Sequence, residues 1–427
     1  MNRYRRLVGA GVIISLVGVA LAACKQASNN VPLAPNNAWP ILQFEPEPHS
    51  LSVLANISPT RHPKIGLDSV ASGVVHVLVV IGDGDESRLA MINSNNGGDT
   101  YEKPVWVSEA GIPVSSHGEN SPTLIMNPDI TYAAWNQKGD IRLARSLSWG
   151  ESFEKPVRIS DKPTQDFSGY VALGVAPDGD VYAVWLDTRD REHGDKVYSL
   201  YTARSTDHGQ TFAKNIRVAA HVCECCRPIV TFGSNGEVLV FWRHIYPGSV
   251  RDMTVAVSHD SGETFSAPVR IAADNWRLEG CPDSGVALAR SGNRIYAAWL
   301  TEASRAISGG RLSWSDNAGE SWAPAVSASQ NVLDAKYPAM SAASDGRVEL
   351  VFQGRNPLKD RGWATTSAFL VEIANDGSRS APVEVPGVTA AVSRPTVYAA
   401  TNGRLFVGWT AAQDGTAAAF ISRARQM

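Results

Sequence analysis

Residues 258–265 have the sequence S-H-D-S-G-E-T-F, and the same eight-residue pattern occurs four more times in the chain. The other copies are residues 94–101, 146–153, 205–212 and 315–322. In this pattern a short polar side chain can accept backbone hydrogen bonds within a turn, and a Gly allows a positive φ. The final aromatic residue can anchor the turn to the layer beneath it. The five octets therefore predict a repeated turn between two strands.

A short apolar strand, usually closed by an aromatic residue, is predicted upstream of each turn. It occurs seven times, about 50 to 57 residues apart, at residues 75–80, 131–135, 181–185, 238–242, 295–299, 348–352 and 405–409. One strand precedes it, often beginning at a Pro, and two more follow, one on each side of the turn. Four short strands per repeat at this period are typical of a β-propeller. We therefore predict an all-β fold, a seven-bladed β-propeller, with a six-bladed one as the alternative.

The last predicted repeat, which ends at residues 418–423, lacks a fourth strand. Residues 49–57 belong to no other repeat. Pairing these two segments would remove an exposed sheet edge. We therefore predict that an N-terminal strand completes the last blade and closes the propeller domain, which we place at residues 41–427.

The first 40 residues have the features of an exported protein. Three arginines precede an apolar run at residues 7–20, which is short for a transmembrane span, and L-A-A-C ends at Cys24. This ending resembles a bacterial lipobox, which implies a signal peptide at residues 1–23 and lipidation of Cys24. Residues 24–40 would be a flexible tether, and Lys25 in the second position implies an outer-membrane lipoprotein facing the periplasm or the cell surface. An ordinary signal peptide with an unrelated Cys is the alternative.

The formal net charge of the chain is -3, and removing residues 1–23 takes away three arginines and no acidic residue. A mildly acidic protein is a poor partner for nucleic acid. We therefore expect no nucleic-acid partner. The expected partners are the membrane, through the lipid anchor, and an unknown ligand or protein.

The five octets resemble Asp-boxes, also called BNR repeats, which occur in sialidases and many other β-propellers. The resemblance spans most of the chain and implies the propeller architecture. It implies little about activity, because the Asp-boxes of the family lie away from the active site. The catalytic domain of sialidases has six blades, so the predicted seven depart from that family.

Propeller geometry places the loops that enter the innermost strands on the face opposite the octets. One of these loops, residues 221–228, has the sequence H-V-C-E-C-C-R-P, and the next repeat has a cysteine at nearly the matching place. Because adjacent blades bring such loops together, four cysteines are predicted to converge at the mouth of the central channel: Cys223, Cys225, Cys226 and Cys281.

Four converging cysteines have two main interpretations. In an oxidising compartment they would form two disulfides, and Cys223–Cys226 with Cys225–Cys281 is the least strained pairing. Alternatively they form a thiolate metal site, with His221 and His244 as nearby imidazole candidates and Cu(I) or Zn(II) as the metal. Redox chemistry at the Cys223-x-x-Cys226 motif is less favoured, because no βαβ pattern surrounds it. The leading hypothesis is a binding or metal-handling protein, and a disulfide-bonded interaction scaffold is an alternative.

The sialidase resemblance implies a further alternative, an exo-sialidase or related glycosidase acting on acidic sugars. That mechanism needs arginines that clamp a carboxylate, a Tyr activated by a Glu, and an Asp as acid or base. Three arginines near a Pro faintly echo the family's Arg-Ile-Pro motif, although no intact copy exists. The residues that the resemblance implies for these roles are Arg61, Arg227, Arg394, Tyr337, Glu279 and either Asp68 or Asp187.

Overall fold

A computed structural model describes residues 39, 42–51, 66–68, 74–82, 84–162, 167–191, 198–304, 307–359, 366–388, 391–413 and 416–426. The chain divides into two units, Met1–Asn30 and Val31–Met427, and all described residues belong to the second. Apart from one 3-10 turn, η2 (Gly84–Glu86), the regular structure of the described residues is β-strand, which confirms the all-β prediction. No helix in these ranges has the length and apolarity needed to cross a bilayer.

The described strands form six antiparallel sheets, and within each sheet the strands follow largely in chain order. The first two sheets contain β3 (Gly66–Asp68), β4 (Val75–Ile81), β5 (Arg88–Ser94) and β6 (Val105–Trp106), then β7 (Thr123–Met126), β8 (Thr131–Gln137), β9 (Asp140–Ser146) and β10 (Val157–Arg158). The next sheet has eight strands: β11 (Ser168–Val175), β12 (Val181–Asp187), β13 (Tyr198–Ser205), β14 (Ile216–Val222), β15 (Ile229–Phe232), β16 (Val238–Tyr246), β17 (Val250–Ser258) and β18 (Val269–Arg270).

Three further sheets complete the described part of the chain. Two of them have four strands each: β19 (Ala287–Ser291), β20 (Arg294–Ser304), β21 (Ile307–Ser315) and β22 (Val326–Ser327), then β23 (Leu333–Ala342), β24 (Val348–Arg355), β25 (Thr366–Ile373) and β26 (Val383–Glu384). The last contains strands from both ends of the chain: β27 (Val392–Ala399), β28 (Arg404–Gln413), β29 (Thr416–Gln426), β1 (Leu42–Phe44) and β2 (His49–Ser50).

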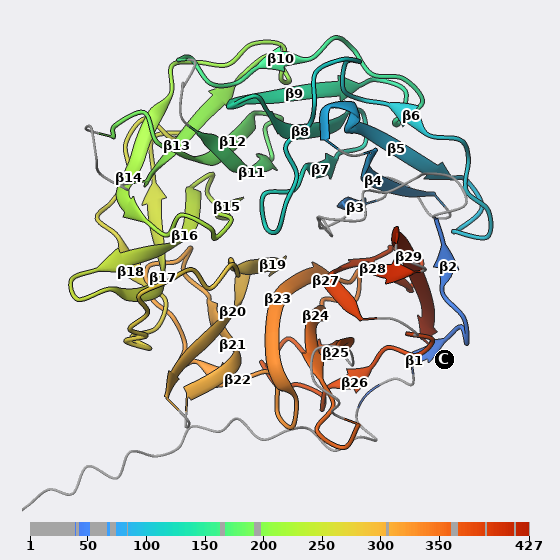
Figure 1. The fold of residues 1–427 in the computed structure, drawn as a ribbon. Coiled ribbons are helices and arrows are strands. Elements are labelled where there is room, and N and C mark those ends of the chain that lie inside the picture. Colours follow the sequence, from blue (N-terminus) through green and yellow to red (C-terminus); the bar gives the residue numbers. More distant parts are fainter. Residues whose placement is uncertain are drawn as a thin grey trace, which may run out of the picture. The chain divides into compact units, whose positions relative to one another are not determined.

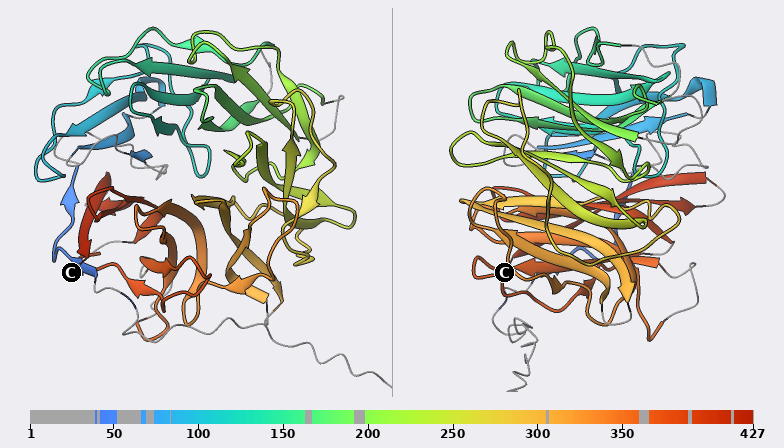
Figure 2. Two further views of the ribbon diagram at one scale, coloured as in Figure 1. Left: turned by 180° about the vertical axis from the view of Figure 1, so that it is seen from behind. Right: turned by 90° about the vertical axis from the view of Figure 1, so that its left-hand side faces the viewer.

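The sheets of the second unit succeed one another around a common centre, with β3, β7, β11, β15, β19, β23 and β27 nearest to it (Figure 1, Figure 2). The hydrophobic core lies between neighbouring sheets. One cluster, for example, joins Tyr132 and Leu143 of one sheet to Val171 and Val181 of the next. Because both faces of each sheet are covered, the second strands are buried on both faces and mostly apolar rather than alternating. Their closing tryptophans are accordingly almost fully buried: Trp135, Trp185, Trp242, Trp299 and Trp409.

The five octets form the turns that the sequence predicts. In each, the hydroxyl of the first Ser accepts a hydrogen bond of 2.8 or 2.9 Å from the backbone N–H of the Gly four residues later. In the octet at residues 258–265, Asp260 also accepts a 2.9 Å bond from the N–H of Thr264, and Gly262 has a φ of 87°. The turn packs on a neighbouring group of strands, since Tyr182 donates to the carbonyl of Ser261 at 3.0 Å.

The two ends of the described chain meet in one sheet, at a seam formed by β29 and its N-terminal partners. Strand β1 pairs with β29, and Leu42 lies opposite Gln426. Strand β2 also pairs with β29, and His49 lies opposite Ile421. The pairing of β2 agrees with the predicted position of residues 49–57, of which 52–57 lie outside the described residues. Strand β1 has no counterpart in the sequence prediction. The core of this sheet continues into the first one, because Ile421 and Val77 belong to one buried cluster.

Candidate functional site: a thiol cluster beside a polar centre

The cysteine-rich loop lies at the strand ends opposite the octets. It connects β14 to β15, and its position is fixed where Val222 pairs with His244 and the N–H of Cys223 donates to the carbonyl of Arg243 at 2.9 Å. His221 takes a left-handed φ of 55° just before this contact. These bonds place the cysteines against the β18–β19 loop, which carries Cys281.

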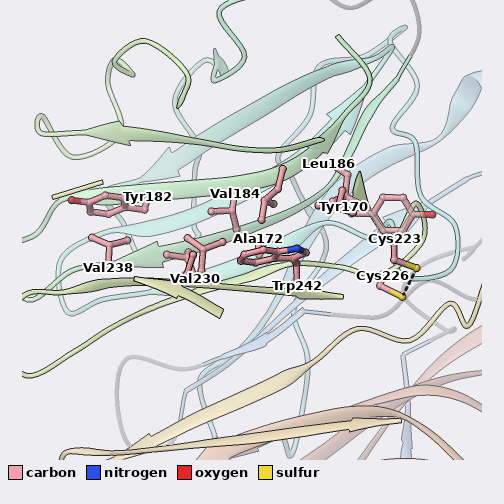
Figure 3. Packing of buried hydrophobic residues seen from close by; sticks show 14 of the residues in the cluster. Tyr170, Ala172, Tyr182, Val184, Leu186, Cys223, Cys226, Val230, Val238 and Trp242 are labelled. Carbon is pink, nitrogen blue, oxygen red and sulfur yellow. Dashed lines mark hydrogen bonds between the residues drawn. The ribbon is translucent and has the colours of Figure 1, made fainter. Parts of the chain in front are cut away.

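Three sulfurs of this loop form a compact, buried group, called here the thiol cluster: Cys223, Cys225 and Cys226. Their Sγ–Sγ distances are 3.4 Å for Cys223–Cys226, 3.8 Å for Cys223–Cys225 and 4.0 Å for Cys225–Cys226. The three side chains are 1%, 6% and 1% exposed in chain order. Figure 3 shows the ring of Tyr170 close to the sulfurs of Cys223 and Cys226. Within the described residues these three cysteines are the group with metal-ligand spacing.

A disulfide joins Cys225 to Cys281, with a Cα–Cα distance of 6.2 Å. It confirms that the two loops come together, as the repeat register predicts. The second bridge of the predicted pairing is absent, because Cys223 and Cys226 are free thiols. The two-disulfide interpretation is therefore half right, and a site with all four sulfurs as thiolates would require reduction of the existing bridge.

Arg251, on β17, supplies the main cationic contact to the thiol cluster. Its Nη1 donates to Cys223 Sγ at 3.0 Å and to the carboxylate of Glu224 at 2.9 Å, while its Nε donates to the carbonyl of Leu278 at 3.0 Å. The hydrogen bond with Cys226, together with the charges of Arg243 and Arg251, lowers the pKa of Cys223 to about 7 against the opposing effect of burial.

The neighbouring thiol behaves in the opposite way. Burial, followed by the hydrogen bond and the charge of Cys223, raises the pKa of Cys226 well above its usual value. Within this pair Cys223 is therefore the sulfur that ionises first, and Cys226 is the thiol that donates to it.

Arg243 supports the cluster without binding it. Its side chain is 1% exposed and donates to the carbonyls of Arg251, Ser284 and Leu300 at 2.9, 3.2 and 2.9 Å. These acceptors lie on β17, on the loop after Cys281 and on β20. One buried cation therefore ties together the strands and loops that carry the cysteines.

The predicted imidazole ligands do not join the sulfurs. The Nδ1 of His244 accepts a 3.2 Å hydrogen bond from the indole N–H of Trp242, and burial lowers the pKa of His244 to about 4. Its ring packs at 73° against Tyr246. His221 is exposed. The structure therefore places a neutral His244 outside the metal-ligand group found among the described residues.

A second group of side chains, called here the polar centre, lies next to the thiol cluster: Asp283, Tyr337 and Arg394. Arg394 Nη2 contacts Asp283 Oδ2 at 2.6 Å and the Tyr337 hydroxyl at 3.3 Å, and that hydroxyl is 3.4 Å from Asp283 Oδ2. The guanidinium carbon of Arg394 stands 4.5 Å from the centre of the Tyr337 ring. The three residues come from β23, from β27 and from the β18–β19 loop.

The backbone at the polar centre is unusual. Asp283, Tyr337 and Arg394 have positive φ values of 46°, 54° and 47°, and so does Tyr170, beside the thiol cluster, at 57°. For the three that lie in strands, the pairing register shifts at the same place, as in a β-bulge. Bulges redirect side chains and often occur next to functional sites, and left-handed non-Gly residues persist only where their surroundings hold them. This arrangement marks the centre as a candidate binding site.

The β18–β19 loop connects the thiol cluster to the polar centre. The backbone N–H of Asp283 donates to Cys225 Sγ at 3.3 Å, while its carboxylate binds Arg394. The hydroxyl of the next residue, Ser284, accepts a 3.3 Å bond from the N–H of Tyr337. A change in the bonding or the charge of Cys225 Sγ therefore acts directly on Asp283, a residue of the polar centre.

Two residues implied by the sialidase resemblance have structural roles instead. Arg227 donates to the backbone carbonyls of Glu119, at 3.0 Å, and Ser121, so its guanidinium is used within the fold. Asp187 is fully buried and accepts side-chain hydrogen bonds that hold the end of β12. Its donors are Ser168, Trp185 and Arg189.

The implied pairing of Tyr337 with Glu279 differs from the observed one. Glu279 is exposed, and the carboxylate that contacts Tyr337 belongs to Asp283. Burial raises the pKa of Tyr337 to about 12, which does not favour a nucleophilic phenolate. Cys24, Arg61 and the side chain of Asp68 lie outside the described residues.

Comparison with solved structures identifies the fold. A Trypanosoma rangeli sialidase in complex with sialic acid matches with a TM-score of 0.51 and 13% identity over 92% of this chain, which spans 59% of that sialidase chain. A polysaccharide lyase matches with a TM-score of 0.50 and 10% identity over 86% of this chain and 90% of the lyase chain. A protein of unknown function from Dyadobacter fermentans has a TM-score of 0.49 and 13% identity over 90% of this chain and 99% of that one.

A scan of protein-family profiles and a search of curated proteins found no match to the sequence. At 13% and 10% identity, the likeness to the sialidase and the lyase shows the fold alone. The chain therefore has a sialidase-like β-propeller fold, and its chemistry must be derived from its own residues.

Proposed function

We propose that this protein is a seven-bladed β-propeller whose thiol cluster binds a soft metal ion, in the first place Cu(I). The blade count rests on the division of the strands into successive groups of four, two of which merge into the eight-stranded sheet where Val222 pairs with His244. The contact of β27 with β3 and the pairing of β1 and β2 with β29 support a closed arrangement.

The observation that carries the metal site is the spacing of three buried sulfurs. Thiolates around a tetrahedral ion with metal–sulfur bonds of about 2.3 Å stand about 3.8 Å apart. The thiol cluster has separations of 3.4, 3.8 and 4.0 Å. These sulfurs are therefore close to a binding arrangement without movement of the backbone, and sulfur-only ligands favour Cu(I) or Zn(II) over harder ions.

The surroundings suit a site with several thiolates. Arg243 and Arg251 lie near the cluster and offset the negative charge that thiolates would bring into the interior. The hydrogen bond from Arg251 to Cys223 Sγ would orient that ligand, as the groups behind metal ligands commonly do. The burial of all three sulfurs keeps water away from the ion.

Metal binding through all three sulfurs requires the reduced protein. Cys225 can become a ligand only when its bridge to Cys281 opens. Cys281 would then be a fourth sulfur within reach. We therefore assign the three cluster sulfurs to Cu(I), and all four, with Cys281 included, to Zn(II), which prefers a tetrahedral site.

Titration of the reduced full chain with Cu(I), in competition with a chromogenic Cu(I) chelator, tests this function. A Cys24→Ala background leaves the four cysteines of the site as the only thiols. We expect one Cu(I) per chain, and a loss of affinity of more than about 100-fold in Cys226→Ser. The matched control Cys281→Ser should keep its Cu(I) affinity and lose Zn(II) affinity. Equal Cu(I) affinity in all these proteins would contradict the proposal.

A glycosidase acting on acidic sugars is the second candidate function. The observation that favours it is the convergence of the left-handed Tyr337, Asp283 and Arg394 on the polar centre. Release of a fluorophore from a sialoside, lost in Tyr337→Phe and retained in the exposed-site control Glu279→Gln, would support it. Release no faster than in buffer alone would exclude this activity.

We also propose that the propeller is tethered to the outer membrane through lipidated Cys24 and faces the periplasm or the cell surface. The support is the L-A-A-C ending after the apolar run. Wild type should incorporate a labelled fatty acid and sediment with membranes, and Cys24→Ser should do neither. Membrane association that survives this substitution would count against the anchor.

A further inference from the structure

We propose that the four cysteines also form a thiol–disulfide exchange centre, in which the bridge moves between the Cys225–Cys281 pair and the buried Cys223–Cys226 pair. This activity goes beyond metal binding and does not depend on it. It uses the disulfide and the two free thiols that the structure contains.

The positions of the sulfurs carry this inference. Cys223 Sγ lies 3.4 Å from the thiol of Cys226 and 3.8 Å from the bridged sulfur of Cys225. Thiol–disulfide exchange needs an attacking sulfur next to a disulfide sulfur and passes through a mixed disulfide, which a second thiol can resolve. Cys223 has both neighbours, so it can receive the bridge from Cys225 and share it with Cys226.

Access from outside is confined to one end of the bridge. Cys281 is exposed, whereas Cys223, Cys225 and Cys226 are 1%, 6% and 1% exposed. An external thiol can therefore attack at Cys281 but not at the inner sulfurs. The outer pair, Cys225 and Cys281, can therefore exchange with an external partner. The inner pair, Cys223 and Cys226, holds two electrons as free thiols and gives them up when the bridge moves to it.

The internal step conserves atoms and electrons. The sulfur of Cys223 bonds to Cys225 Sγ, the Cys225–Cys281 bond breaks, and Cys281 leaves as a thiolate that takes up the proton released by Cys223. The sulfur of Cys226 then bonds to Cys223 Sγ, the Cys223–Cys225 bond breaks, and Cys225 takes up the proton released by Cys226. One disulfide and two thiols are present before and after.

Two donors are placed where negative charge develops on sulfur. Arg251 Nη1 donates to Cys223 Sγ at 3.0 Å, and the backbone N–H of Asp283 donates to Cys225 Sγ at 3.3 Å. Arg251 also donates to the carbonyl of Leu278, on the loop that carries Cys281. Donors held in place by the fold stabilise thiolates without having to reorganise during the reaction.

The external partner that this chemistry fits is a dithiol. Attack of one of its thiolates on Cys281 forms a mixed disulfide and releases Cys225 as a thiolate. The second thiol of the partner then displaces Cys281, which leaves the partner oxidised to a disulfide and the protein with four thiols. In this reduced form the three sulfurs of the thiol cluster are all free to bind a metal.

Disulfide mapping in the presence of a metal chelator tests the internal step. The full chain in a Cys24→Ala background would be quenched with acid, alkylated and digested for mass spectrometry. In Cys226→Ser the moved bridge cannot be resolved, and we expect a Cys223–Cys225 bridge with an alkylated Cys281 in at least about a tenth of the molecules. In Cys223→Ser only the Cys225–Cys281 bridge should be found, and circular dichroism should show that both variants are folded.

A Cys223–Cys225 bridge in fewer than about a tenth of the folded Cys226→Ser molecules would overturn the exchange centre, and so would a wild type in which only the Cys225–Cys281 bridge is ever found. Neither result would affect Cu(I) binding by the reduced chain, because that titration begins from four thiols. Conversely, bridge movement in a protein that binds no Cu(I) would support the exchange centre and contradict the metal site alone.

Discussion

The octets and the polar centre use the same rare backbone conformation in different ways. In the octet at residues 258–265, Ser261 and Gly262 are both left-handed, and the side chains of Ser258 and Asp260 bond to the N–H groups of the same turn. At the polar centre the left-handed residues are held by contacts from other sheets, such as that of Arg394 with Asp283. Local bonds can repeat a turn five times, whereas the arrangement of the polar centre is formed once, by the assembled sheets.

Arg243→Ala should have the largest effect, because it tests how far the cysteine loops depend on contacts between sheets. The substitution leaves three backbone carbonyls without their buried donor. We expect a loss of about 3–5 kcal/mol in the free energy of unfolding, measured by urea denaturation. The matched control is Arg217→Ala, which removes an exposed ion pair with Asp190 and should cost less than about 0.5 kcal/mol.

A loss from Arg243→Ala no greater than that of the control would remove the distinction between the two regions. It would mean that the two cysteine-bearing loops keep their positions through their own strands alone.

Glu349 lies on the octet side of the sheets, but unlike the octet side chains it is not satisfied by hydrogen bonds within a local turn. It is 2% exposed on β24 opposite Glu372 on β25, and its Oε2 has no hydrogen-bond partner among the described residues. Burial, then the charge of Glu372, raises the pKa of Glu349 to about 8 despite the opposing charge of Arg347, and Asp345 adds to the increase.

Because the folded chain holds this proton more tightly than the unfolded chain, the stabilisation is complete below the unfolded pKa and is lost as pH rises towards 8. Between pH 6 and pH 8 we expect wild type to lose about 1–3 kcal/mol relative to Glu349→Gln, in urea denaturation at each pH. Parallel pH profiles for the two proteins would show that Glu349 is ionised in the fold. Glu320→Gln, a change at an exposed octet position, serves as the control.

Ser258→Ala should have the smallest effect. It removes the acceptor of the buried N–H of Gly262 and the hydroxyl that donates to Asp260, while the bond from the N–H of Thr264 to Asp260 remains. We expect a loss of about 1 kcal/mol in the free energy of unfolding, with Cu(I) binding unchanged. Altered Cu(I) affinity would show that the octets and the thiol cluster are coupled, against the independence expected of a turn held by its own bonds.

Much of the fold follows from the sequence because its signals are local and repeated. The octets specify their own turns, and the spacing of the apolar strands predicts the order of the sheets. The same register brings Cys281 to the loop of Cys225, which the disulfide confirms. The seam is predicted only in part, because β1 is a three-residue strand with no repeat partner to reveal it.

The candidate site is less predictable because it depends on side-chain directions that bulges change. A shift in pairing register turns Tyr337 and Arg394 towards Asp283, and no local pattern distinguishes them from other loop residues. Arg251 lies within β17, where alternation gives no sign that it will bond to Cys223. His244 is two residues from Trp242, and the bond between their side chains, which withdraws His244 from the sulfurs, depends on strand geometry.

The seam has a consequence for the order in which the protein can be made. Strand β29 is synthesised after every other described strand, yet it supplies the partner for β1 and β2 at the other end of the chain. During translation β1 and β2 therefore remain without this partner until all the other described strands have been synthesised. The eleven residues of β29 complete the last sheet, because they pair with β1, β2 and β28. A chain terminated before β29 would leave the edges of these strands unpaired, and chaperones and proteases would readily recognise it.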